Sequence, residues 1–352
     1  MIRENVPLAS FTTLGIGGPA RFFAEAATED EVKAALAFAE ARSLPVFLLG
    51  DGSNLLVADE GFPGLVLRVA VKGIHNRAVG DKVEVTAGAG ENWDRFVDVC
   101  VARGLAGVEC LSGIPGLVGG TPVQNVGAYG QEVSQTIVRV RAWDREARWA
   151  VELTNADCCF AYRTSIFNTS AREKYVVLAV TFALTPGGSP CVRYADLKNH
   201  FVGRDDAPTL AEVRDAVRAI RAQKAMVLSP GDPDSRSAGS FFKNPLVDAG
   251  GLRAVEAKAR ARGLLPDDKT VPAYPQPDGR FKVAAAWLIE NAGFAKGYRR
   301  GNVAISSRHT LALTNRGGAT AREVLSLMRE IQAGVRDCFG VELHPEPVFV
   351  GF

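Results

Sequence analysis

Hydrophobic and polar positions in the first hundred residues follow a helical pattern in some stretches and a strand-like one in others. In residues 29–43, apolar side chains recur every three or four positions behind Thr28, which predicts an amphipathic helix with a threonine N-cap. Residues 92–104 repeat this pattern and predict a second helix, with Gly104 just beyond its C-terminus. Short apolar runs between these helices predict strands at residues 45–50, 65–71 and 82–90.

The rest of the chain continues to mix strands with helices. Residues 136–184 are strand-like apart from the interruption CCFAYRTSIF. Residues 209–227 predict a strongly amphipathic helix, which we expect to be the hinge to a further domain. The last third alternates helical and strand patterns at residues 250–263, 282–293, 302–305, 311–315 and 320–340. With no internal repeat and no low-complexity tract, the chain is predicted to be an α+β protein with a mixed sheet in each part.

Bulk composition limits the classes of function. A chain of 352 residues is long enough for two or three domains. Its 41 basic and 39 acidic residues give a net charge of +2, so we expect neither nucleic acid nor a membrane as a partner. The N-terminus lacks a signal-peptide pattern and the chain has no long apolar run, so we expect a cytoplasmic protein. The six cysteines and four histidines show no metal-ligand spacing, so no metal site is predicted.

Two glycine-rich stretches with little charge are the strongest candidates for a binding site. LLGDGSNLLV, residues 48–57, places glycines after an apolar strand, where consecutive backbone N–H groups can hold a phosphate. A hairpin turn is the structural alternative. LSGIPGLVGGTPVQNVGAYG, residues 111–130, is longer than most connections that have no function. A structural Ω-loop is the alternative there. Together the two stretches predict a dinucleotide lying extended across a sheet-rich domain.

Two charged residues stand in unusual surroundings. Arg163 lies among apolar and aromatic neighbours at a predicted strand end in FAYRTSIF, where its permanent charge requires a carboxylate or an anionic ligand. A structural ion pair would satisfy it as well as a ligand. Glu346 lies between two prolines in LHPEP, which fix the backbone and remove N–H groups on both sides. A solvent-facing glutamate on an edge strand is the alternative for this residue.

The order and spacing of several motifs resemble the UDP-N-acetylenolpyruvoylglucosamine reductase family of bacterial peptidoglycan synthesis. The motifs are TTLGIGG, LGDGSNLLV, IPGLVGGTPVQNVGAYG, YRTSIF, RYADL, GSFFKNP, YPQPDG, KVAAAWLIENAG and HPEP. The resemblance runs from about Phe11 to the C-terminus. GSFFKNP together with QNVGAYG is highly specific, whereas LGDGSN alone occurs in many flavin enzymes. RYADL, around Tyr194, is similar to the longer subgroup with a tyrosine loop over the substrate.

The resemblance implies a flavoprotein oxidoreductase with noncovalent FAD and with NADPH as co-substrate. Its substrate would be UDP-N-acetylglucosamine enolpyruvate, reduced to UDP-N-acetylmuramate by a hydride delivered to the enolpyruvyl methylene carbon. The implied fold is α+β, a two-subdomain FAD-binding fold of the vanillyl-alcohol-oxidase (PCMH) type plus a C-terminal α/β substrate-binding domain. The domains expected are the FAD-binding domain at 15–186, split near 72, the tyrosine loop and linking helix at 187–225, the substrate-binding domain at 226–345, and a returning strand at 346–352. We expect a monomer.

The resemblance also implies roles for individual residues. Ser240 would give a proton to the enolate, while Arg163 and Glu346 would face the substrate carboxylate and the developing enolate. The residues expected to line FAD are Gly50, Gly52, Ser53, Asn54, Gly119, Gly120, Thr121, Gln124, Asn125, Gly127 and Ala128. Those expected to bind the UDP part are Tyr194, Lys224, Asn244, Tyr274 and Lys282. Val348 stands where some relatives have a basic residue, so a flavin or substrate contact there is absent or comes from elsewhere.

Two other functions fit part of the sequence. Another noncovalent FAD-dependent oxidase or dehydrogenase of the same fold would keep both glycine-rich loops. Oxidases and dehydrogenases of this fold often tether the flavin covalently through a histidine or cysteine, and LGDGSN and IPGLVGG contain neither. A non-catalytic nucleotide-sugar-binding protein would keep Lys224 and Tyr194 but would not need Ser240, Arg163 and Glu346 together.

Overall fold

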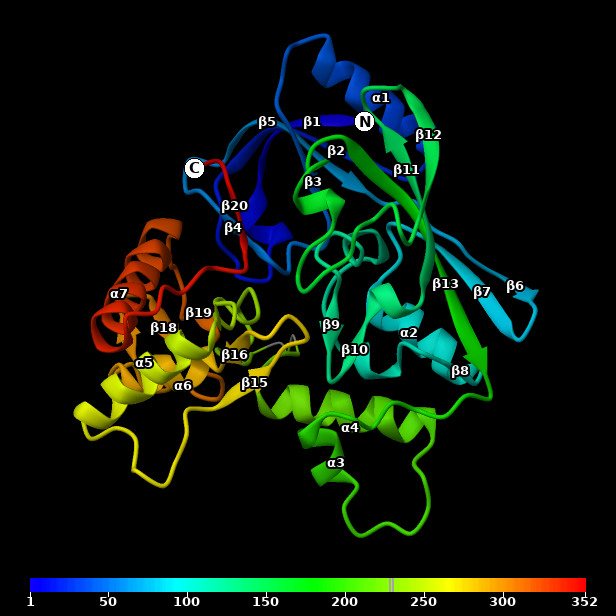
Figure 1. Cartoon of the computed structure of the whole chain (residues 1–352). Helices are drawn as coiled ribbons and strands as arrows, with labels where there is room; N and C mark the ends of the chain where they lie inside the picture. The colour runs from blue at the N-terminus through cyan, green and yellow to red at the C-terminus, as the bar shows by residue number, and fades with distance from the viewer. Residues whose placement is uncertain (228, 230) are drawn as a thin grey trace. The chain divides into compact units, whose positions relative to one another are not determined.

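The computed structural model describes residues 1–227, 229 and 231–352, which form two compact units (Figure 1). Unit 1 comprises Met1–Val6, Ala20–Asp51 and Pro63–Val227, and unit 2 comprises Pro7–Pro19, Gly52–Phe62 and Leu228–Phe352. Two segments from the first 62 residues therefore belong to the unit that is otherwise C-terminal. The domain boundaries expected from the sequence stay a prediction.

Unit 1 contains a four-stranded sheet packed against one helix. In sheet order the strands are β1 (Ile2–Pro7), β2 (Pro19–Ala26), β5 (Phe62–Val69) and β3 (Val46–Leu49), and the helix is α1 (Glu29–Glu40). The hydroxyl of Thr28 accepts the N–H of Glu31, which confirms the predicted N-cap. Val32, Ala35 and Ala39 of α1 are buried in one core with apolar side chains of β2 and β5.

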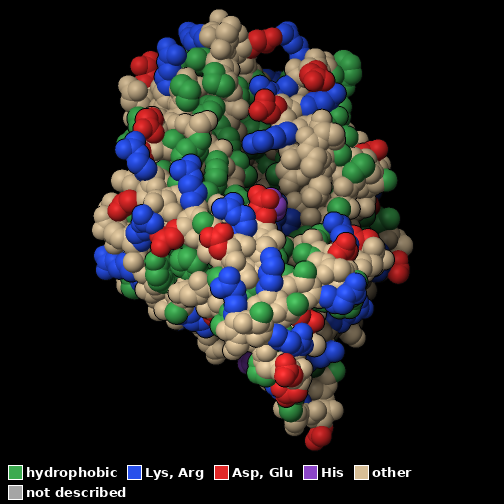
Figure 2. All heavy atoms as spheres, turned by 60° about the vertical axis from the view of Figure 1, so that its left-hand side comes forward, with side chains coloured by type: hydrophobic (Ala, Val, Ile, Leu, Met, Phe, Trp, Pro, Cys, Tyr) green, Lys and Arg blue, Asp and Glu red, His purple; other side chains and the backbone are tan. Residues whose placement is uncertain are grey.

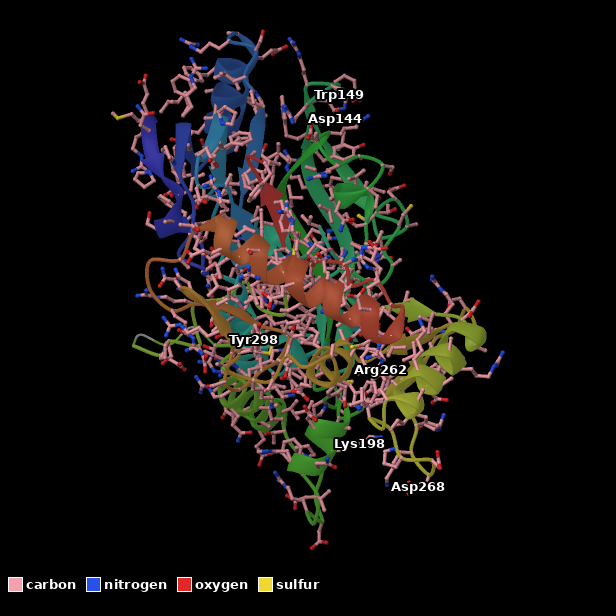
Figure 3. The ribbon with its side chains drawn as sticks, turned by 90° about the vertical axis from the view of Figure 1, so that its left-hand side faces the viewer. Asp144, Trp149, Lys198, Arg262, Asp268 and Tyr298 are labelled. Carbon is pink, nitrogen blue, oxygen red and sulfur yellow. The ribbon has the colours of Figure 1, made fainter. Side chains whose placement is uncertain are left out.

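A larger, antiparallel sheet forms the second layer of unit 1. Its strands are β6 (Ile74–Val79), β7 (Lys82–Gly88), β8 (Leu105–Ala106), β11 (Ile137–Asp144), β12 (Trp149–Thr154) and β13 (Tyr175–Pro186). Helix α2 (Trp93–Ala102) buries Trp93 and Phe96 against Phe182 of β13. Asp144 and Trp149 pair at the turn that joins β11 to β12 (Figure 3). The aromatic cluster holds α2 on the sheet and thereby fixes the start of the glycine-rich loop that follows.

Two helices end unit 1 and pack near that loop. They are α3 (Ala195–His200) and α4 (Leu210–Gln223). Their apolar side chains share a small core with Cys110 and Tyr129. Thr209 and Glu212 form a reciprocal capping box at the start of α4, so the predicted helix is confirmed, although it ends at Gln223.

The described part of unit 2 combines short sheets with three α-helices. The strands are β14 (Leu246–Val247), β16 (Phe281–Val283) and β15 (Ala273–Pro275) in one sheet, β17 (Arg299–Arg300), β18 (Val303–Ile305) and β19 (Leu313–Asn315) in another, and β4 (Leu55–Val57) with β20 (Val348–Val350) in a third. The helices are α5 (Ala249–Ala261), α6 (Ala285–Asn291) and α7 (Ala321–Phe339). Helix α7, orange-red in Figure 1, contacts α5, α6 and β18. Its Leu327 and Ile331 share a core with Leu14 and Leu56 from the two N-terminal segments.

One expectation from the sequence is wrong, and one structural alternative is excluded. A mixed sheet was expected in each part, but both three-stranded sheets of the described part of unit 2 are antiparallel, and the parallel pair there is β4 with β20. LGDGSN is not a hairpin turn, because β3 pairs with β5 while β4 pairs with β20. A short apolar run does not reveal its partner strand, since the pairing depends on distant sequence.

The surface carries no dominant charge. On the face seen in Figure 2, basic side chains are interspersed with acidic ones, in keeping with the net charge of +2. Among the helices of the described residues, none has the length and apolar character needed to cross a membrane.

Candidate active site

The glycines of the two loops fall into two structural classes. At Gly52 a Cβ would lie 1.8 Å from a backbone oxygen, and at Gly119 it would lie 2.6 Å from Ala89 Cβ, so these positions require glycine for close packing. At Gly50 and Gly120 a Cβ would meet no described atom within 4 Å. The backbone at Gly50 and Gly120 therefore faces open space that a ligand can occupy.

The amide of Asn125 organises the longer loop. Its Nδ2 donates to Glu132 Oε2 at 2.8 Å and to the Ala161 carbonyl at 3.1 Å, while its Oδ1 accepts the N–H of Ser134 at 3.1 Å. The residue is 1% exposed and has a left-handed φ of 45°, which is uncommon for a residue other than glycine. The side chain therefore shapes the loop, and a ligand at this point would meet the backbone.

The other predicted FAD residues of this loop lie close to Asn125 in sequence. Thr121 is buried, and its hydroxyl donates to the Val118 carbonyl at 2.8 Å. Gln124 is half-buried. Gly127 and Ala128 form β9 (Gly127–Ala128), which pairs with β10 (Gln131–Glu132). The backbone at Gly120, in a loop with almost no charge, fits a flavin dinucleotide, because a pyrophosphate can be held by N–H groups without lysine.

Arg163 lies in the turn between β12 and β13, not at the strand end predicted from the sequence. Its Nη1 donates to the Gly127 carbonyl at 3.0 Å, and Ser165 Oγ donates to the Val123 carbonyl at 2.6 Å. Arg163 also has a left-handed φ of 55°. Strained backbone of this kind costs about 1–3 kcal/mol and is concentrated at functional sites. The structure thus joins the predicted carboxylate-binding arginine to the predicted FAD loop.

The two predicted UDP contacts of unit 1 also lie together. Tyr194 is the N-cap of α3, and its 46% exposed ring meets Tyr129 edge-to-face with centroids 5.5 Å apart. Lys224 Nζ lies 2.7 Å from Asp196 Oδ2 in the first turn of α3. Burial raises the pKa of the Tyr129 phenol. A ring and an ammonium group at one helix end suit a base or sugar together with a phosphate.

In unit 2, residues 237–244 form an extended segment held on both sides through Phe241. Its N–H donates to the Leu311 carbonyl at 2.6 Å, and its carbonyl accepts the N–H of Glu346 at 2.9 Å. The ring of Phe241 is completely buried. Ser240 and Glu346, both half-buried, therefore stand on neighbouring backbone segments.

Each of these two residues has a neighbour that was not assigned to it from the sequence. Ser240 Oγ lies 3.2 Å from His309 Nε2, and His309 stands 69 positions further along the chain with no spacing signal. The Asn54 amide donates to the Glu346 carbonyl at 3.3 Å, and the Asn54 carbonyl accepts the N–H of Val348 at 2.9 Å. Asn54, predicted to line FAD, thus holds the backbone that carries Glu346.

The remaining predicted UDP contacts lie around the sheet of β14, β15 and β16. Tyr274 and Lys282 are directly opposite each other in the antiparallel register of β15 and β16, so their side chains share one face. The Tyr274 ring is 55% exposed. Asn244 Oδ1 accepts the N–H of Ala285 at 2.9 Å, which orients its amide at the start of α6.

The predicted site residues therefore form two sets. Unit 1 holds Gly50, Gly119, Gly120, Thr121, Gln124, Asn125, Gly127, Ala128, Arg163, Tyr194 and Lys224. Unit 2 holds Gly52, Ser53, Asn54, Ser240, Asn244, Tyr274, Lys282 and Glu346. Within the described part of the chain, no group of three or more His, Cys, Asp or Glu side chains is arranged to bind a metal ion.

Comparisons with known proteins match parts of both units. Residues 20–150 match the family model of a FAD binding domain, and residues 232–350 match that of the UDP-N-acetylenolpyruvoylglucosamine reductase C-terminal domain. The reductase of this name from Thermobifida fusca is 52% identical over 99% of this chain and 98% of its own length. The one from Streptomyces avermitilis is 49% identical over 99% and 94%.

A solved structure extends the likeness to the fold. The crystal structure of UDP-N-acetylenolpyruvylglucosamine reductase (MurB) from Thermus caldophilus has 26% sequence identity and a TM-score of 0.66, covering 99% of this chain and 100% of that one. The fold class expected from the sequence, a PCMH-type FAD-binding fold with a C-terminal substrate-binding domain, is confirmed, as is the expected oxidoreductase family. With about half of its residues identical to those of curated members over nearly its full length, the chain belongs to the UDP-N-acetylenolpyruvoylglucosamine reductase family.

Proposed function

We propose that this chain reduces UDP-N-acetylglucosamine enolpyruvate to UDP-N-acetylmuramate in peptidoglycan precursor synthesis, with FAD as noncovalent cofactor and NADPH as co-substrate. The observation that carries the proposal is the pairing of Phe241 with Glu346, which sets Ser240 beside Glu346. Both residues lie inside the matched C-terminal domain at 232–350. The relatives that share this domain are named for the activity.

The proposed chemistry assigns a task to each charged or hydroxyl group. The backbone near Gly50 and Gly120 would hold FAD, which would supply the hydride for the enolpyruvyl methylene carbon. Ser240 Oγ then gives its proton to the adjacent carbon, so that an O–H bond breaks and a C–H bond forms. Arg163 would neutralise the substrate carboxylate, and Glu346 would contact the developing enolate.

The expected UDP contacts of each unit have side chains that suit part of UDP. Lys224 and Lys282 supply positive charge for the diphosphate, and the exposed rings of Tyr194 and Tyr274 offer faces for uracil and ribose.

Two measurements test the proposed function. Purified protein should be yellow, with an absorbance band near about 450 nm that is released on denaturation. NADPH oxidation should then depend on UDP-N-acetylglucosamine enolpyruvate. Flavin-dependent turnover of small alcohols or sugars, with no NADPH oxidation on the enolpyruvate, would favour an oxidase or dehydrogenase of the same fold, and a colourless protein that binds the UDP-sugar would favour a non-catalytic one.

Ser240→Ala separates the two half-reactions. We expect flavin reduction by NADPH to stay within about twofold of wild type, and flavin reoxidation by the enolpyruvate to fall by about 10²–10⁴-fold, because only the second step needs the proton. Ser189→Ala, at an exposed serine of unit 1, is the control. An equal loss in both half-reactions would make Ser240 a structural residue.

A further inference from the structure

The contact between Ser240 and His309 is not used by the proposed chemistry. Ser240 Oγ and His309 Nε2 are 3.2 Å apart, within hydrogen-bonding distance, and both residues are half-buried. His309 lies in the loop that joins β18 to β19, and Ser240 lies in the segment beside this loop. The hydroxyl that is proposed to donate the proton therefore has an imidazole as a neighbour.

The loop that carries His309 is tightly held. Ser306 Oγ accepts the N–H groups of Arg308 at 3.1 Å and His309 at 3.2 Å. The carbonyl of His309 accepts the N–H of Ala312 at 3.0 Å, and the hydroxyl of Thr310 donates to Glu290 on α6. The backbone on both sides of the imidazole is thus fixed by hydrogen bonds.

The segment that carries Ser240 is anchored to the same loop. The buried carboxylate of Asp234 accepts the N–H of Ser307 at 3.2 Å and forms an ion pair with Arg316 Nη2 at 2.6 Å. On the other side of Ser240, the N–H of Phe241 donates to the Leu311 carbonyl. Because both backbone segments are restrained by hydrogen bonds, the fold keeps Ser240 and His309 close to each other.

We propose that His309 is a positioning residue for Ser240, a role that rests on the proposed function. The Nε2–H of His309 donates to Ser240 Oγ and occupies the oxygen lone pair on that side. The hydroxyl proton is then directed away from the imidazole and toward the substrate carbon. When Ser240 has given its proton to that carbon, the N–H stabilises the alkoxide by a charge-assisted hydrogen bond until water restores the proton.

The opposite hydrogen bond would have the opposite effect. If Ser240 donated to an unprotonated Nε2, the hydroxyl proton would be held by the imidazole and kept from the substrate. Removing the imidazole would then speed up protonation, whereas the proposed arrangement requires that it slow down. The direction of the kinetic effect therefore tests the role of His309.

The test compares His309→Ala with His309→Gln in the FAD-loaded full chain, using UDP-N-acetylglucosamine enolpyruvate as substrate. Reoxidation of reduced flavin by substrate should fall by about 10–100-fold in His309→Ala and recover in part in His309→Gln, whose amide keeps an N–H donor. Flavin reduction by NADPH should stay within about twofold in both. The solvent deuterium isotope effect on reoxidation should rise in His309→Ala, because proton transfer then limits the rate.

Further variants separate this proposal from a failure of the proposed function. In the Ser240→Ala background, His309→Ala should cause no additional loss, because the histidine acts through the serine. His75→Asn, at an exposed histidine of unit 1, should behave as wild type. Reoxidation that is unchanged or faster in His309→Ala, or a loss equal in both half-reactions, would overturn the role of His309. Full reoxidation in Ser240→Ala would instead show that Ser240 is not the proton donor.

Discussion

Gly119 and Gly120 are neighbours with opposite steric surroundings, so the same substitution should act differently at each. Gly119→Ala places a methyl group 2.6 Å from Ala89 Cβ and should lower the free energy of unfolding by about 1–3 kcal/mol. Gly120→Ala points into open space and should leave the free energy of unfolding nearly unchanged. It should weaken FAD binding by about tenfold or more, since the methyl group would occupy the space proposed for the ligand.

Thermal unfolding of the flavin-free protein and titration with FAD measure the two effects separately. Gly119→Ala provides the comparison, because its damage should appear without ligand. Wild-type FAD affinity in Gly120→Ala would mean that the cofactor does not contact this position.

For individual residues, the sequence predicted which side chains belong to the candidate site better than it predicted which groups they contact. Asn125 could be singled out by its place in an uncharged loop, but its hydrogen bond to the Ala161 carbonyl depends on a turn 36 positions away. No pattern in the sequence indicated a role for His309, because a single histidine in a loop has many ordinary explanations. The chemistry of a side chain is evident from the local sequence, whereas the groups that the side chain contacts are determined by the tertiary fold.

The N-terminus of α7 is held by a residue from a distant segment. Asp59 Oδ1 accepts the N–H of Ala321 at 2.7 Å, and Oδ2 accepts that of Arg322 at 3.2 Å. Asp59→Ala should lower the free energy of unfolding by about 0.5–2 kcal/mol, because two N–H groups at the positive end of the helix lose their acceptor. Chemical denaturation of the purified variant measures this loss.

Glu60→Ala is the matched control for Asp59→Ala. Glu60 forms a 3.5 Å ion pair with Arg322, and both side chains are largely exposed. Such pairs contribute at most about 1 kcal/mol. If both substitutions changed stability equally, the carboxylate of Asp59 would not be acting as a helix cap.

Elements with local signals were predicted more accurately than their pairing. The helices at α1, α2 and α4 were predicted from apolar periodicity, and the N-cap of α1 from Thr28. The pairing of β4 with β20 was not predicted, because Leu55 and its partner Val348 lie at opposite ends of the chain. Strand pairing is determined by non-local contacts, which apolar patterns do not encode.

Across the whole molecule, carboxylate pairs make stability sensitive to acid. Hydrogen bonds from Arg141 lower the pKa of Glu29 below its usual 4.5, and those from Arg139 do the same for Glu84. A carboxyl group whose pKa is lower in the folded chain stabilises the fold at pH values above the pKa that it has in the unfolded chain. This contribution is lost as the pH falls through the pKa that it has in the folded chain. Burial raises the pKa of Asp51, so the contribution of this residue to stability has the opposite pH dependence.

The free energy of unfolding should therefore be nearly constant from pH 7 to about 5 and fall below about pH 4.5. Urea titrations over this range measure it. Glu84→Gln should be less stable than wild type at pH 7, and the difference should shrink as the pH falls through the lowered pKa of Glu84, because the wild-type carboxyl group then becomes uncharged as well. Glu4→Gln, at an exposed position, should follow the wild-type curve. A Glu84→Gln curve parallel to that of wild type at every pH would contradict this.

The hydrogen bond between the Asn54 amide and the Glu346 carbonyl has a consequence for synthesis on the ribosome. The two residues are 292 positions apart, and the bond from Asn315 to the Leu14 carbonyl spans 301. Leu14 and Leu56 therefore leave the ribosome long before the helices and strands that bury them. During that interval their apolar side chains are without their final neighbours and open to wrong contacts or chaperones. Unit 2 can close its core only after translation has reached β20.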